Sequence, residues 1–258
     1  MRGLLCLLMS LPLFASAADL TIAAASNYRL LLDDAVQRFE KAEKVEVSVI
    51  YGSSGKLATQ IQHGAPYDLY FSANAAYMTR LEQAGELAGM VITDGYGQLA
   101  LLAAEKSEEP FVESLDTLLK GKAIAIAQPR HAPFGQAAVS YLESNGLYEK
   151  VNESLVYAEN VAQVMHMVRS GAAEYGFVAL SLIKQGSDAA QRLKILPLKD
   201  KSLLKQQHAV IAGAKNTELA TSFSQFMQQP EITQLKRRYG IEPENDDVNN
   251  GAPGNGRG

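Results

Sequence analysis

The chain has 258 residues, of which 47% are hydrophobic and 20% are charged. This length suits one or two domains with a sizeable buried core. The formal net charge of −4 excludes a broad basic surface, so nucleic acid is not an expected partner and any bound anion needs a local site.

The first 17 residues have the pattern of an export signal. Arg2 gives a short positive start, residues 4–14 form an apolar run too short to span a bilayer, and residues 15–17 are a small-residue cleavage signal. The single cysteine, Cys6, lies in this segment, so the processed chain would have no disulfide and no thiolate ligand. We expect residues 1–17 to be a signal peptide and the product to be an exported, soluble protein.

Strand and helix patterns alternate through the first half of the chain. Strands are expected at residues 20–24, 45–50 and 68–72, with helices starting at Ser26, Ser54 and Asn74. The apolar spacing from Leu32 to Phe39 follows one helical face, and Gly64 and Gly85 suit helix ends.

The same alternation continues in the second half. Strands are expected at residues 99–103, 123–127, 175–178, 194–196 and 209–212, and helices at 134–145, 161–170, 217–228 and 231–239. Strands alternating with helices predict an α/β fold with largely parallel sheets. The last residues, 243–258, are rich in Asn, Gly, Asp and Pro, and we expect a disordered tail there.

Four of the expected helices begin directly after a strand and a loop of small residues. These starts carry Ser26 with Asn27, Ser54, Phe134 and Val161. Such starts meet at one edge of parallel sheets, and each offers unpaired N–H groups and a partial charge of roughly +0.5. A serine at one helix start is usually only an N-cap. The combination of four starts predicts an anion site that needs no cationic side chain.

The stretch 52–56, Gly-Ser-Ser-Gly-Lys, resembles a nucleotide phosphate loop but fails its pattern. Two residues instead of four separate Gly52 from Gly55, and Leu57 instead of Ser or Thr follows Lys56. Lys56 is expected to be a solvated helix residue, with long-range attraction for the anion as the alternative.

The four histidines do not have metal-ligand spacing. They are His63, His131, His166 and His208. We therefore expect no protein-ligated metal cation. His131 is expected at the surface, with a place beside the anion site as the alternative. No Ser-His-Asp order or nucleophile elbow is visible, so no catalytic residue is expected.

Five segments taken together resemble the periplasmic molybdate-binding proteins of ABC transporters. They are AAASNYRLLLDDAVQRFE, GSSGKLATQIQHGAPYDLYFSAN, QPRHAPFGQAAVSYL, ENVAQVMHMVRSGAAEYGFVAL and LKRRYGI. The resemblance runs from about Asp19 to Ile241. It implies a two-lobed periplasmic binding protein of type II, with crossover strands near 99–103 and 206–211. Lobe one would comprise residues 19–97 plus 209–242, and lobe two residues 98–208.

The resemblance also implies a site for molybdate or tungstate, a tetrahedral dianion held by hydroxyl and main-chain donors. The matching positions are Ser26, the adjacent Asn27 and Ser54, with Phe134 and Val161 as main-chain donors. Many family members have a Tyr near the end of GFVAL, where this chain has Ala179. We expect Phe134 to fill the space of that Tyr, and the molybdate-to-tungstate preference stays open.

In function, the resemblance implies the solute-binding component of an ABC importer. Such a protein is not an enzyme, uses no cofactor, acts as a monomer and delivers its ligand to an inner-membrane permease. One alternative is a binding protein for another oxyanion, such as sulfate or thiosulfate. Another is an exported hydrolase with Ser26 or Ser54 as the nucleophile, although its motifs contain no partnered histidine. Iron binding would need paired tyrosines, which are absent from the motifs.

Overall fold

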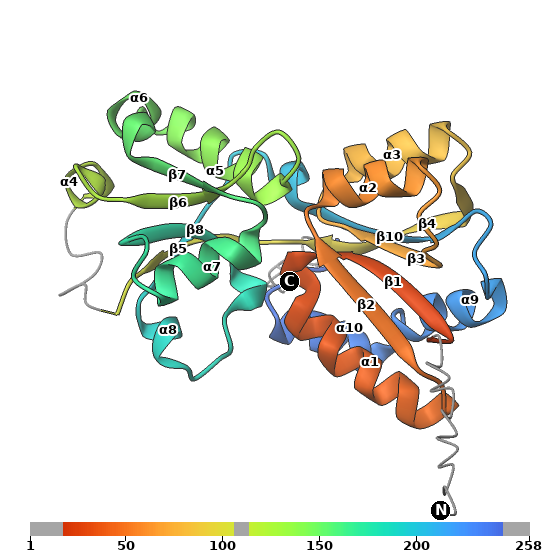
Figure 1. Cartoon of the computed structure of the whole chain (residues 1–258). Coiled ribbons are helices and arrows are strands. Elements are labelled where there is room, and N and C mark those ends of the chain that lie inside the picture. Colours follow the sequence, from red (N-terminus) through yellow and green to blue (C-terminus); the bar gives the residue numbers. More distant parts are fainter. Residues whose placement is uncertain (1–17, 106–113, 245–258) are drawn as a thin grey trace, which may run out of the picture.

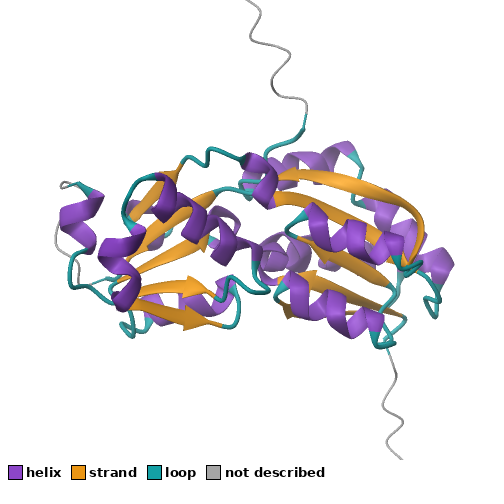
Figure 2. Cartoon of the chain, turned by 90° about the horizontal axis from the view of Figure 1, so that it is seen from above, coloured by secondary structure: helices purple, strands orange, loops and turns teal. Residues whose placement is uncertain are grey.

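A computed structural model describes residues 18–105 and 114–244. These residues form two halves side by side, each built on a five-stranded sheet (Figure 1). Seen from above, each sheet lies between helices (Figure 2). In the described ranges, no helix is both long and apolar enough to cross a membrane. The expected signal peptide, residues 1–17, lies outside the described residues, as do residues 245–258 of the expected tail.

The first sheet has the strand order β2-β1-β3-β10-β4. Its strands are β1 (Leu20–Ala25), β2 (Val47–Gly52), β3 (Leu69–Ser72), β4 (Leu87–Tyr96) and β10 (Lys205–Ile211). Strand β1 is parallel to both β2 and β3, whereas β10 is antiparallel to β3 and β4.

Helices cover both faces of this sheet. They are α1 (Arg29–Glu43), α9 (Thr217–Phe226) and α10 (Pro230–Arg238) on one face, and α2 (Ser54–Gln62) and α3 (Ala75–Gln83) on the other. Successive strand residues point to opposite faces. Ile22 therefore packs in one core with Phe39, while Ala23 packs in the other with Leu57 and Ile61.

The second sheet has the order β7-β6-β8-β5-β9. Its strands are β5 (Leu99–Ala103), β6 (Ile124–Ala127), β7 (Leu155–Ala158), β8 (Tyr175–Ala179) and β9 (Leu193–Leu196). The helices of this half are α4 (Leu115–Leu119), α5 (Pro133–Ser144), α6 (Tyr148–Val151), α7 (Val161–Arg169) and α8 (Asp188–Gln191). Short 3-10 turns complete the chain: η1 (Ser26–Tyr28), η2 (Asn152–Ser154), η3 (Leu180–Leu182) and η4 (Lys201–Leu204).

Four strands of each sheet run in the same direction, which confirms the prediction of mostly parallel sheets, and the fifth strand, β10 in the first sheet and β5 in the second, runs opposite to them. Strand β6 is parallel to β7 and β8, but β5 is antiparallel to β8 and β9. The cause is that the chain passes between the halves twice, at residues 97–98 and between β9 and β10. A strand arriving from the other half enters its sheet at the carboxyl edge of the parallel strands, so it runs opposite to them.

The lobe division stays a proposal. Strand β10 pairs with β4 from Lys205 onward, so residues 205–208 go with lobe one rather than lobe two. At the other end, Glu242 pairs with Tyr96 and the Glu244 carboxylate contacts Lys205, which ties the described C-terminal residues to the first sheet.

Candidate functional site

A small cavity of about 10 Å³ lies where the two halves meet. Residues 25–27, 52–54 and 73 line it from the first half, and residues 132–134, 160 and 161 from the second. The space is close to what one water-sized sphere needs, so a ligand that fits it is small and compact. The structure brings all five expected residues to this cavity, namely Ser26, Asn27, Ser54, Phe134 and Val161.

Two pairs of parallel strands explain why these residues meet. In the first sheet Ala25 is in register with Gly52, and in the second sheet Ala127 is in register with Ala158. The chain leaves each of these four strands at the same edge of its sheet. The two edges face one another, so four loops and the helices that follow them surround the cavity.

The two serine hydroxyls are oriented by main-chain N–H groups. Ser26 Oγ accepts a hydrogen bond from the Ala162 N–H at 3.3 Å, across the two halves. Ser54 Oγ accepts one from the Ala73 N–H at 3.1 Å. A hydroxyl has one hydrogen and two lone pairs. Because a lone pair is used in each bond, each hydroxyl hydrogen is left to donate to a ligand.

Three helix starts add main-chain donors. Helix α2 begins at Ser54, α5 at Pro133 and α7 at Val161. Proline has no N–H, so Phe134 supplies the first donor of α5. No acceptor among the described residues takes the N–H of Ser54, Phe134 or Val161, as is usual in a first helical turn. The helix dipoles make these positions favourable for negative charge.

The cavity lining contains no charged side chain. Lys56 is an exposed residue of α2, as expected, and its ammonium lies 2.5 Å from the Glu159 carboxylate of the other half. This pair is about half exposed and brings no net charge to the cavity. No group of three or more potential metal-ligating side chains occurs in the described ranges. The donors therefore suit an anion that is held by neutral dipoles.

Comparison with known proteins agrees with this geometry. Residues 20–242 match the family model of the bacterial extracellular solute-binding proteins. The chain belongs to this family. Among its relatives, the molybdate-binding protein ModA of Azotobacter vinelandii is 31% identical over 231 residues, which are 88% of this chain and 90% of that protein. ModA of Rhodobacter capsulatus is 30% identical over 247 residues, covering 93% and 94% of the two chains.

A solved structure supports the same assignment. The periplasmic molybdate-binding protein of Azotobacter vinelandii matches with a TM-score of 0.75 and 30% identity, over 86% of this chain and 98% of that one. The predicted two-lobed periplasmic binding protein fold is thereby confirmed. The family also confirms the prediction of a binding protein rather than an enzyme.

In this solute-binding protein, His131 lies at the rim of the site and not simply at the surface. Its Nδ1 is 2.8 Å from Ser53 Oγ in a hydrogen bond, and its carbonyl accepts the Gly55 N–H at 2.9 Å. Burial lowers the pKa of the His131 ring, and the Lys56 and Arg130 charges add to this while Glu159 opposes it. Sequence reasoning missed Ser53, although its position just before the expected helix start was a signal.

Asn27 is held by residues that the sequence did not single out. Its Nδ2 donates to Gln206 Oε1 at 2.8 Å, and its carbonyl accepts from the Ser181 hydroxyl of the second half at 2.8 Å. Asn27 is fully buried, and its Oδ1 has no hydrogen-bond partner among the described residues. These contacts join residues far apart in the sequence, so no local pattern could reveal them.

Ala179 is fully buried at the end of β8, where it pairs with Leu99. It does not line the cavity. The Phe134 ring lies against the neighbouring crossover segment, because a Cβ placed on Gly97 would be 3.2 Å from its Cζ. The idea that Phe134 fills the space of the missing Tyr stays a prediction.

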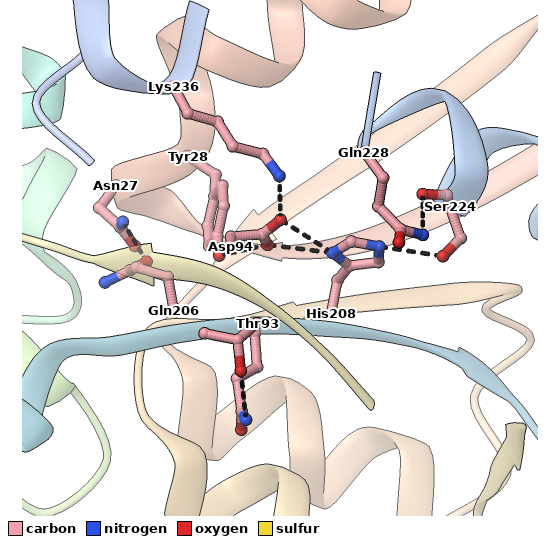
Figure 3. Close-up of polar contacts among 10 residues, drawn as sticks. Asn27, Tyr28, Thr93, Asp94, Gln206, His208, Ser224, Gln228 and Lys236 are labelled. Carbon is pink, nitrogen blue, oxygen red and sulfur yellow. Dashed lines mark hydrogen bonds and ion pairs between the residues drawn. The ribbon is translucent and has the colours of Figure 1, made fainter. Parts of the chain in front are cut away.

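The solute-binding protein also contains a Ser-His-Asp arrangement that the sequence did not reveal (Figure 3). His208 Nε2 is 3.0 Å from Ser224 Oγ, and its Nδ1 is 3.0 Å from the Asp94 carboxylate. All three side chains are buried and none of them lines the cavity. The geometry therefore supports a structural role and not a nucleophile facing a ligand.

Proposed function

We propose that this protein captures molybdate in the cavity between its lobes and delivers it to the permease of an ABC importer. The observation that carries the proposal is a small cavity lined from both halves by hydroxyl and main-chain donors, with no charged side chain. Two relatives that cover most of this chain, those of Azotobacter vinelandii and Rhodobacter capsulatus, are named molybdate-binding proteins, which agrees with that chemistry.

The donor set suits a dianion that carries no proton. Burying such an ion is unfavourable unless its oxygens accept hydrogen bonds. Ser26 and Ser54 offer hydroxyl hydrogens, and Ser54, Phe134 and Val161 offer main-chain N–H groups. Fixed donors discriminate by size, because a smaller tetrahedral anion would leave some bonds long and weak.

Several finer properties belong to the same proposal. Tungstate would bind with molybdate, because the donors recognise a tetrahedral oxyanion and not its central atom. The protein would act as a monomer in the periplasm, after removal of residues 1–17. Its membrane partner would be the permease that receives the released anion.

Calorimetric titration tests the proposal directly. Sodium molybdate, tungstate, sulfate and phosphate are titrated separately into the protein in a buffer free of these anions. We expect molybdate and tungstate to bind with a dissociation constant of about 1 μM or tighter, equivalent to about −8 kcal/mol. Sulfate and phosphate should bind roughly a hundredfold more weakly. Sulfate binding as tight as molybdate binding would replace this function with that of a general oxyanion carrier.

A further inference from the structure

The turn that carries two cavity residues is attached to one face of strand β10. Residues 206 and 208 point to the same side of this strand because strand side chains alternate. Gln206 Oε1 accepts from Asn27 Nδ2 at 2.8 Å. His208 contacts Asp94, whose Oδ2 accepts from the Tyr28 hydroxyl at 2.9 Å. Two consecutive residues of η1 are thus fixed to β10, directly or through Asp94 (Figure 3).

The Gln206 amide has a defined direction. Its Nε2 donates to the Leu204 carbonyl at 3.0 Å, which leaves Oε1 to face Asn27. Both Asn27 and Gln206 have no exposed surface, so water does not compete for this bond. The nitrogen of the Asn27 amide is therefore held toward Gln206. Because Asn27 lines the cavity, this bond fixes the orientation of a side chain of the candidate site.

Gln206 also lies between the two segments that connect the halves. Strand β10 begins directly after η4, where the chain returns from the second half. The other connection passes beside it, because the Gly97 N–H donates to the Leu204 carbonyl at 2.9 Å. A Cβ on Gly97 would lie 2.6 Å from Gln206 Nε2, so this glycine allows the close approach. A change in the angle between the halves must therefore act on Gln206.

We propose that Gln206 is a positioning residue that couples the two crossover segments to the amide of Asn27. The proposal rests on the proposed function of the cavity. Without the Gln206 acceptor, the Asn27 amide loses its anchor and its terminal torsion is free to turn. The Asn27 side chain and the η1 turn that carries it then no longer keep one position at the cavity, so the loss of Gln206 weakens anion binding through Asn27.

A matched pair of substitutions tests this role. Gln206→Met keeps the length of the side chain and removes its acceptor. Gln207→Met is the control, because Gln207 is the next residue of β10, points to the opposite face and donates to Thr93 Oγ1 at 3.3 Å. In molybdate titrations we expect Gln206→Met to bind about tenfold more weakly than wild type, and Gln207→Met to stay within about twofold.

A double-mutant cycle separates positioning from a merely structural effect. If Gln206 acts through Asn27, Gln206→Met should not weaken binding further in an Asn27→Ala background. Equal losses in the two Met variants, or additive losses in the cycle, would overturn the proposal.

Hydrogen exchange of the ligand-free protein gives a readout that does not depend on molybdate. The amides of residues 26–29 should exchange faster in Gln206→Met than in Gln207→Met. If wild type bound no molybdate, the proposed function would fail while this comparison still tested the coupling. Equal exchange in both variants would refute the coupling itself.

Discussion

Ser26 and Ser54 show how one atom serves both the fold and the ligand. Each Oγ accepts a hydrogen bond from a main-chain N–H, so the hydroxyl hydrogen of the serine points away from that N–H. We expect Ser26→Ala and Ser54→Ala each to weaken molybdate binding by about 1.5–3 kcal/mol, the range for a hydrogen bond to a charged group. Calorimetry measures this loss.

The two serines should differ in stability. Ser54→Ala leaves the N–H of Ala73, a buried residue, without an acceptor, so urea unfolding should also show a loss of about 1–3 kcal/mol. Ser26→Ala frees an N–H at the junction of the halves and should destabilise the fold less. Unchanged molybdate affinity in both variants would remove these hydroxyls from the site.

Gly55 lies directly against the second half, where its N–H donates to the His131 carbonyl at 2.9 Å. A Cβ there would lie 2.9 Å from the His131 carbonyl oxygen of the other half. Gly55→Ala should weaken molybdate binding by about 1–3 kcal/mol, because the halves can no longer approach as closely. The helix preference of Ala over Gly, about 1 kcal/mol, should offset part of the loss of unfolding stability that arises because the same Cβ would lie 2.9 Å from the ring and hydroxyl of Tyr77. A variant with wild-type affinity would show that this contact is not needed for binding.

At the scale of elements, a buried charged cluster joins α10 to the first sheet. It consists of Asp94 on β4, His208 on β10, Lys236 on α10 and the Tyr28 hydroxyl, and the Lys236 ammonium is 2.5 Å from Asp94 Oδ1 (Figure 3). Burial alone would raise the pKa of Asp94, but His208 and Lys236 outweigh it and hold this pKa well below its usual range. The carboxylate therefore stays charged and fixes β4, β10, α10 and η1 together.

Asp94→Asn should destabilise the protein by about 3–5 kcal/mol, because it leaves the Lys236 ammonium buried without its partner. Asp116→Asn is the matched control, since its pair with Lys150 is about half exposed and should contribute about 0–1 kcal/mol. Urea unfolding at neutral pH measures both. A small effect of Asp94→Asn would mean that Lys236 finds another partner.

The lowered pKa of Asp94 also predicts how the stability of the fold depends on pH. Its contribution to stability is full above its unfolded pKa of about 3.9 and is lost as the pH falls toward the lower folded value. Wild-type stability should therefore drop in acid below about pH 4. Asp94→Asn should lack that part of the decline.

At the scale of the whole molecule, polar contacts hold the halves together around the cavity. They include Ser53 with His131, Gly55 with the His131 carbonyl, Lys56 with Glu159, Ser26 with Ala162, and the Asn27 carbonyl with the Ser181 hydroxyl. Three of them involve the start of α2 and two involve His131. The junction is therefore sensitive to the charge of His131.

Molybdate affinity should fall in mild acid because of His131. Burial at the junction lowers the pKa of this ring, whereas in separated halves it would return toward about 6.5. Protonation of His131 therefore favours the separated halves. The contribution of neutral His131 to closure is complete above the pKa of about 6.5 and is lost as the pH falls through the lower pKa of the closed protein. Between about pH 7.5 and 5.5 the affinity should fall by less than tenfold in wild type and stay flatter in His131→Gln.

His63→Gln is the control for this experiment, because His63 is an exposed residue of the first half away from the cavity. Calorimetry across the pH series distinguishes the variants. If the pH dependence persisted in His131→Gln, the affinity loss would have to come from the ligand or from another group.

Much of the fold follows from local sequence patterns. The helix predicted at 161–170 is observed at Val161–Arg169, and the one predicted at 134–145 at Pro133–Ser144. Strand β4 was missed because its half-exposed residues include Gly89 and Gly95 and lack a clear alternation. Strand β7 was missed because its pattern does not alternate: Val156 and Tyr157 are both exposed between the buried Leu155 and Ala158.

The sequence by itself determined where the helices that supply donors begin. The signals for such a start, namely the end of a strand, a serine or a proline at the first turn, all lie within a few residues of one another. It therefore led to Ser26, Asn27, Ser54, Phe134 and Val161, which the structure brings to one cavity. Only the tertiary structure decided the reversed direction of β5 and β10, the Gln206–Asn27 bond, the Asp94 cluster and the His131 contacts. These join residues many positions apart, and their partners are chosen by how the two sheets pack and connect, which no local pattern encodes.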